Sequence, residues 1–127
     1  MDKLASRKWL KQAADDLNWT QSNIREKIWY GACFTAQQAA EKALKAYLIY
    51  CGKSITKIHD LGALLEMCVK IDKSFEELRE ASASLTGYYT PTRYPDVAEF
   101  MIFSKNKAEE ALELAQEILR FVEGKIK

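Results

Sequence analysis

Apolar residues recur every three or four positions along most of the chain, which is the spacing of helices that bury one face. Glycine, proline and polar breaks divide this pattern into five segments. The predicted helices span residues 3–25, 29–51, 59–71, 74–86 and 96–123. The last of these patterns leaves room for a break near Phe103 and Ser104. No segment shows the strict alternation that is typical of a strand.

Local signals support several of these boundaries. Gly52 is expected to end the second helix as a C-cap glycine. The Gly52-Lys53-Ser54 stretch also looks like the end of a phosphate-binding loop, but the pattern needs an earlier glycine where Tyr47 stands, and a preceding strand. Ser74 and Glu77 have the S-x-x-E spacing of a capping box, which predicts the start of the fourth helix.

Long amphipathic helices with short connections predict an all-α fold, an up-and-down four-helix bundle with an additional short helix. The 127 residues, of which 48% are hydrophobic and 29% charged, suit a single helical domain over residues 1–127. The formal net charge of +1 argues against indiscriminate binding to nucleic acid or a membrane surface, so any phosphate site must be local.

Composition also bears on the cellular compartment. No apolar run approaches the roughly 20 residues that a membrane span needs, and the N-terminus lacks the hydrophobic core of a signal peptide. The three cysteines are widely spaced, which favours a cytoplasmic chain with reduced thiols. With one histidine and no close cysteine pair, we expect no metal site and no cofactor. A Cys–His nucleophile pair stays open, although each cysteine falls within a predicted helix, where it is more often a small core residue.

Polar residues on the second helix form a stripe at Gln37, Glu41 and Lys45. The order Glu41 then Lys45 is the favoured orientation of an i, i+4 ion pair, which contributes a few tenths of a kcal/mol on an exposed helix. The stripe is either a solvated face or a polar seam that faces a partner or ligand. His59 also has two interpretations: it binds a phosphate or acts as an acid–base group, or it caps the third helix together with Asp60.

A proline-bearing break follows the fourth helix, from Gly87 to Asp96. It gathers both prolines, Arg93 and three tyrosines, which include Tyr89 and Tyr94. Proline fixes φ and restricts the residue before it, so the segment is expected to be stiff. It is either a ligand-contacting loop or a rigid connector between helices.

Taken in order, these pieces resemble the HEPN domain family (higher eukaryote and prokaryote nucleotide-binding). The residues that carry the resemblance are Trp9, Ala13, Asp16-Leu17, the block from Cys33 to Ala46, His59-Asp60-Leu61, Leu64-Leu65, Tyr89 and Arg93-Tyr94-Pro95-Asp96. The resemblance implies a four-helix bundle with an extra short helix, and commonly a homodimer. It also implies a two-component, often toxin–antitoxin, pairing with a minimal nucleotidyltransferase, and nucleotide binding through polar residues. Other members are metal-independent ribonucleases.

The ribonuclease branch carries a motif of an arginine, four to six residues, and a histidine. Gly52, Lys53 and Ser54 occupy the positions where that arginine would precede His59. After Arg93, the matching positions hold Ala98, Glu99 and Phe100. The motif is absent, so the resemblance does not extend to the residues that give the family its ribonuclease activity.

The sequence therefore predicts a non-catalytic binding module rather than an enzyme. Its ligand site is expected to involve Glu41, Lys45, His59, Tyr89, Arg93 and Tyr94, with no catalytic residue assigned. Arg93 would clamp a phosphate, Lys45 would add a point charge, and Tyr89 or Tyr94 would stack on a base. The ligand is a nucleotide, RNA or a partner nucleotidyltransferase. The alternatives are a ribonuclease or phosphodiesterase with His59 as base and Arg93 as clamp, and a purely structural dimeric adaptor.

Overall fold

The computed structural model of the chain describes residues 2–54, 57–88 and 103–126. Within these ranges every regular element is helical, which confirms the predicted all-α class. The elements are α1 (Lys3–Arg25), α2 (Trp29–Tyr50), α3 (Leu61–Ile71), the short 3₁₀ helix η1 (Lys73–Leu78), α4 (Arg79–Thr86) and α7 (Lys105–Lys125).

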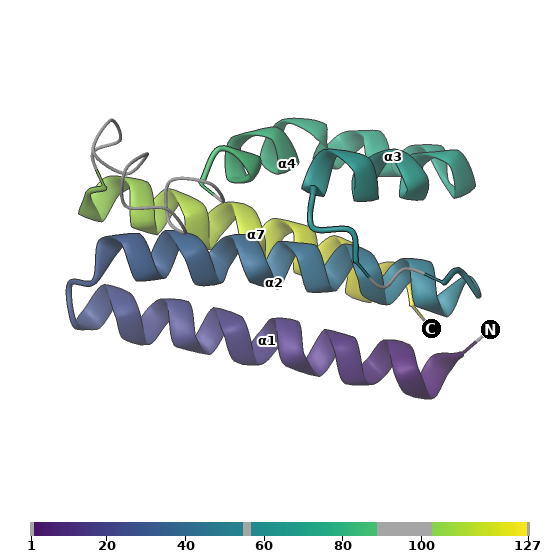
Figure 1. Cartoon of the computed structure of the whole chain (residues 1–127), viewed down its shortest axis with the longest axis horizontal. Helices are drawn as coiled ribbons and strands as arrows, with labels where there is room; N and C mark the ends of the chain where they lie inside the picture. The colour runs from purple at the N-terminus through teal and green to yellow at the C-terminus, as the bar shows by residue number, and fades with distance from the viewer. Residues whose placement is uncertain (1, 55–56, 89–102, 127) are drawn as a thin grey trace.

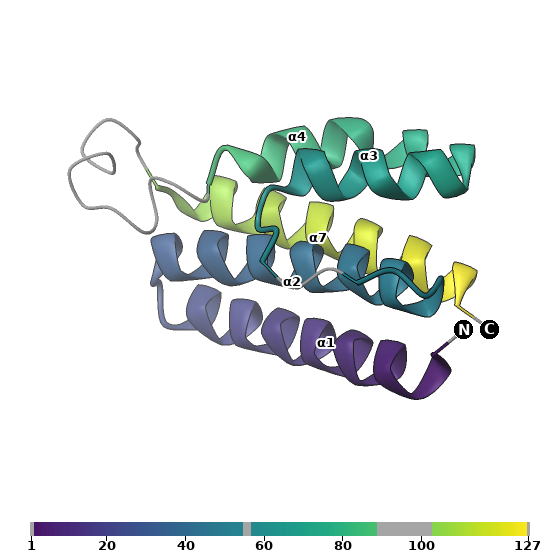
Figure 2. The ribbon, with the colours of Figure 1, turned by 45° about the vertical axis from the view of Figure 1, so that its right-hand side comes forward.

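The helices form a bundle with α2 at its centre. Helix α1 runs antiparallel to α2 on one side, while α3 and α4 form a helical hairpin on the other (Figure 1). Helix α7 lies beside α2 and also contacts α1 and α4 (Figure 2). The bundle predicted from the hydrophobic pattern is therefore present, with the α3–α4 hairpin covering the α2–α7 layer.

The ends of the helices follow from capping chemistry. Asp2 begins α1 by accepting a hydrogen bond from the amide of Ala5 at 3.0 Å. Asp60 begins α3 in the same way, with Oδ1 2.9 Å from the amide of Gly62. Gly52 follows α2 with φ +83°, a left-handed conformation that glycine adopts without a steric penalty. The C-cap role predicted for Gly52 is thus confirmed, and α3 begins two residues later than expected.

The fourth predicted helix differs from the structure at its start. Asp72, rather than Ser74, is the N-cap: its Oδ1 accepts from the Ser74 amide at 2.9 Å and from the Ser74 hydroxyl at 2.7 Å. The predicted capping box of Ser74 and Glu77 is therefore wrong, because Asp72 already engages the serine hydroxyl. The segment then begins as η1, and α4 starts only at Arg79.

The last helix has a described start at Lys105, after Ser104. The hydroxyl of Ser104 accepts from the amide of Lys107 at 3.2 Å, which makes Ser104 the N-cap. This agrees with the break allowed near Phe103 and Ser104. The predicted start at Asp96 lies outside the described residues.

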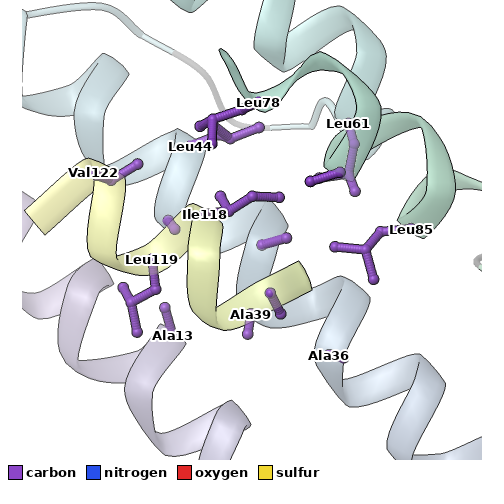
Figure 3. Close-up of a cluster of buried hydrophobic side chains, with 14 of the residues drawn as sticks. Ala13, Ala36, Ala39, Leu44, Leu61, Leu78, Leu85, Ile118, Leu119 and Val122 are labelled. Carbon is purple, nitrogen blue, oxygen red and sulfur yellow. The ribbon is translucent and has the colours of Figure 1, made fainter. Parts of the chain in front are cut away.

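The core is built from leucines that meet the alanine-rich face of α2. Figure 3 shows Ala13 of α1, Leu44 of α2, Leu61 of α3 and Ile118 of α7 in one cluster. Aromatic rings extend it, because the ring centroid of Phe75 in η1 lies 4.4 Å from that of Tyr47 and 4.9 Å from that of Phe121. Full burial of a side chain such as Phe75 contributes about 2–3 kcal/mol. The small η1 segment is thereby fixed to α2 and α7.

Candidate functional site

The polar stripe on α2 lies inside the protein. Gln37, Glu41 and Lys45 retain 1%, 3% and 2% of their accessible surface. The solvated-face interpretation of this stripe is therefore wrong. Charged residues are almost never buried to this degree unless they are paired, so the partners of the two charges decide what the stripe does.

Glu41 and Lys45 form the ion pair that their spacing predicts. The ammonium of Lys45 lies 3.0 Å from Oε2 of Glu41. The same ammonium lies 5.7 Å from the ring centroid of Trp9 on α1, within the range of a cation–π contact. The energy of this contact depends on its burial. Removing one partner of a buried ion pair costs about 3–5 kcal/mol, whereas an exposed pair at the same spacing contributes only a few tenths of a kcal/mol.

His59 joins this pair from the connector that leads into α3. Its Nδ1 lies 3.1 Å from Oε2 of Glu41, the oxygen that also accepts from Lys45. Because an ionised carboxylate only accepts hydrogen bonds, Nδ1 carries the proton in this contact. The His59 side chain is 54% exposed, whereas Glu41 is buried. The cluster therefore runs from the interior of the bundle to its surface.

The neighbouring Asp60 explains why His59 is available for this contact. Asp60 caps α3, so the capping function considered for the His59-Asp60 pair belongs to the aspartate. The connector is then held at Asp60 by the helix and at His59 by the carboxylate of Glu41.

The second carboxylate oxygen of Glu41, Oε1, differs from Oε2 in its hydrogen bonding. Oε1 is buried and has no hydrogen-bond partner among the residues that the structure describes. A buried acceptor without a donor costs about 1–3 kcal/mol. An acceptor in this position, at the inner end of a cluster that reaches the surface, is suited to a water molecule, an ion or a ligand donor.

Burial of Cys33 and Cys68 limits their use as nucleophiles. Burial raises the pKa of the Cys33 thiol to about 11 and that of Cys68 to about 12, so both are protonated at neutral pH and are poor nucleophiles. In the described part of the chain, no group of three or more His, Cys, Asp or Glu side chains is arranged to hold a metal ion. No helix there combines the length and apolar character needed to cross a membrane.

Comparison with known proteins assigns the family. The profile of the HEPN domain matches residues 6–125. The chain belongs to the HEPN family.

Two solved structures resemble this HEPN chain over nearly its whole length. TT1696 from Thermus thermophilus is 39% identical, with a TM-score of 0.80, over 94% of this chain and 97% of its own. ST0689, described as an archaeal HEPN homologue, is 32% identical, with a TM-score of 0.78, over 96% and 98% of the two chains. No curated protein sequence gives a significant match.

The HEPN site predicted from sequence is partly visible. His59, 18 positions from Glu41, comes together with the Glu41–Lys45 pair around one carboxylate. The other three predicted residues, Tyr89, Arg93 and Tyr94, lie outside the described residues. Their proposed contacts with a ligand stay predictions.

Two residues of α1 belong near this site although they were absent from the predicted set. Trp9 covers Lys45, and Asp16 pairs with Lys42, the residue next to Glu41 on α2, at 2.8 Å. Both are among the residues that carry the HEPN resemblance, which was the available signal. The hydroxyls of Thr20 and Thr35, 2.7 Å apart and buried, continue the polar contacts between α1 and α2.

Proposed function

We propose that this HEPN protein is a non-catalytic nucleotide-binding module. The observation that carries the proposal is the half-exposed imidazole of His59, held by the buried Glu41–Lys45 pair. With Nδ1 engaged by Glu41, Nε2 is the ring nitrogen that would meet the ligand: it accepts from a base edge when the ring is neutral and donates to a phosphate when the ring is protonated.

Lys45 and His59 have different roles in this proposal because Lys45 is buried and His59 is half-exposed. Lys45 is enclosed and engaged by Glu41, so it acts in this proposal by holding the carboxylate in place rather than by touching the phosphate. His59 is the group that meets the ligand. Arg93 supplies the bidentate phosphate contact, and Tyr89 or Tyr94 stacks on the base, as the sequence suggested.

The family setting adds a partner to this proposal. The module would act as a cytoplasmic homodimer together with a minimal nucleotidyltransferase, in a toxin–antitoxin-like pair. Nucleotidyltransferases use nucleotides as substrates, so a nucleotide would connect the functions of the two proteins. Co-purification of the two chains, with and without ATP, tests this part separately.

Thermal shift with ATP, GTP, other nucleotides and short RNA tests nucleotide binding. A ligand that binds only the folded state raises the melting temperature by mass action. We expect a saturable rise that is lost in Arg93→Ala and reduced in His59→Gln. The exposed Lys53→Ala variant, in the same connector, is the matched control. Absence of a shift with every nucleotide and RNA would refute the nucleotide proposal.

A ribonuclease or phosphodiesterase is the second candidate, because Glu41 orients His59 at 3.1 Å in the manner of a carboxylate behind a general base. Against it stands the absence of the arginine–histidine spacing of the family's nucleases. Incubation with labelled RNA decides the point. Cleavage by the wild type that disappears in His59→Ala would replace the binding proposal with the enzymatic one.

A purely structural dimeric adaptor is the third candidate. It is favoured by the burial of Gln37, Glu41 and Lys45 against the rest of the bundle. Under this alternative, no nucleotide shifts the melting temperature. The Glu41→Gln variant then loses self-association or stability, and no ligand binding is affected. The thermal-shift series therefore separates it from the leading proposal.

A further inference from the structure

Helix α7 borders two hollows on its side facing α1. They share Gln21 and Gln116 as lining residues and are therefore adjacent, and we call the two together the α1–α7 groove. Its apolar lining comes from Ile24 and Leu17 on α1 and from Leu112 and Leu119 on α7. Ile24 and Leu112 are only partly buried, so apolar surface remains open to solvent there.

Acidic residues of α7 flank this apolar lining. Glu109 and Glu113 line one end of the groove, and Glu123 lines the other. A third hollow, between η1 and α7, shares Glu113 and adds Glu77 and Glu117. The α1–α7 groove itself is lined by three glutamates and by two arginines, Arg25 and Arg120, and the third hollow beside it adds the two further glutamates.

The arrangement of these carboxylates does not help α7 to fold. Glu109, Glu113 and Glu117 succeed one another at intervals of four positions along the exposed side of the helix. Like charges at this spacing destabilise a helix by a few tenths of a kcal/mol for each pair. A partner that carries the opposite charge would remove this repulsion.

We propose that the α1–α7 groove docks an amphipathic helix of a partner protein whose apolar stripe is flanked by lysine or arginine. Leucine-like side chains of the guest helix enter between Ile24 and Leu112, while its cations meet Glu109 and Glu113. Glu109 and Glu123 are 14 positions apart, which is about 21 Å along a helix and accommodates about four turns of the guest.

Charge also selects this occupant over a second copy of the chain. A two-fold contact with its axis close to Glu113 would bring the carboxylates of α7 in one subunit against the same carboxylates in the other. None of Glu41, Lys45 and His59 lines the groove. The docking proposal is therefore independent of the ligand of that cluster.

Fluorescence anisotropy with a labelled peptide tests the proposal on the full chain. The probe is a helical peptide of leucine and lysine at amphipathic spacing, and its leucine–glutamate counterpart is the control peptide. We expect saturable binding of the lysine peptide that weakens with salt, and weakening by about tenfold in Glu113→Lys. The matched variant Glu80→Lys changes the net charge equally at an exposed site on α4 and should stay within about twofold of the wild type.

Three results would overturn the proposal. They are no saturable binding of the lysine peptide, equal binding of the glutamate peptide, and equal weakening by Glu113→Lys and Glu80→Lys. Sedimentation tests the remaining occupant, a second copy of the chain. If Leu112→Asp converts a wild-type dimer into monomers, and the dimer does not bind the peptide, a second copy fills the groove. Circular dichroism checks that each variant is folded. If Leu112→Asp does not fold, the comparison of Glu113→Lys with Glu80→Lys still tests the proposal.

Discussion

Nδ1 of His59 lies 3.1 Å from Oε2 of Glu41, so a solvent-facing ring is anchored to a carboxylate that is itself buried. The contact joins residues 18 positions apart and ties the α2–α3 connector to the central helix. Any group that binds at the imidazole is thereby coupled to the interior of the bundle.

The buried Glu41–Lys45 pair should behave as a unit. Glu41→Gln and Lys45→Met should each lower the free energy of unfolding by about 3–5 kcal/mol, because each leaves one charge buried without its partner. The double variant should recover most of this loss, since both charges are then gone. Urea denaturation of the four proteins measures the coupling.

The exposed pair of Lys11 and Asp15 is the internal control for that cycle, with the same i, i+4 spacing on α1. Its double-mutant cycle should give a coupling below about 1 kcal/mol. Equal coupling energies for the two pairs would contradict the argument from burial.

Gly52 and Gly124 should respond in opposite directions to alanine. Both have open space where a Cβ would be placed, but Gly52 has φ +83°. Gly52→Ala should cost about 1–2 kcal/mol because a left-handed conformation strains an L-residue. Gly124→Ala, within α7, should be neutral or stabilise by up to about 1 kcal/mol. Thermal unfolding measures both, and a Gly52→Ala variant as stable as the wild type would contradict the strain argument.

Asp72 should contribute to the acid limb of the stability curve. Hydrogen bonds from Ser74, together with Lys125, lower the pKa of this carboxyl from 3.8 to about 2. The unfolded state therefore binds the proton at higher pH than the folded state, and the contribution is present above pH 3.8 and is lost as the pH falls toward 2.

Asp72→Asn tests this assignment, because asparagine keeps the capping oxygen but not the charge. Unfolding measured between neutral pH and the acid limb should show a shallower loss of stability in the variant. Parallel curves for the variant and the wild type would mean that Asp72 does not titrate in this way.

The three cysteines should differ in reactivity. Cys33 and Cys68 are buried with a raised pKa, whereas Cys51 is only partly buried. A thiol reagent at neutral pH should label Cys51 first and reach the other two only on unfolding. Mass spectrometry of the labelled native protein gives the order, and early labelling of Cys33 would show that the core opens locally at α2.

Helix positions followed closely from the sequence, because apolar periodicity and caps are local signals. The bounds of α1 matched, and Gly52 ended α2 as expected. The start of α4 did not follow, since Ser74 has the spacing of a cap while the nearby Asp72 is the stronger acceptor. The Glu41–Lys45 contact was predictable from spacing, but its burial depends on Trp9 and on the path of the connector. Those are tertiary features that a helical pattern does not contain.

The central position of α2 sets how the cluster can work. This helix packs against α1, α3, α4 and α7, so its backbone amides should exchange with deuterium only when the whole bundle unfolds. Glu41 and Lys45 should therefore be among the slowest-exchanging residues that the structure describes, and the fold rather than a ligand sets their positions. A ligand that meets His59 finds a preorganised receptor, which reduces the entropy lost on association.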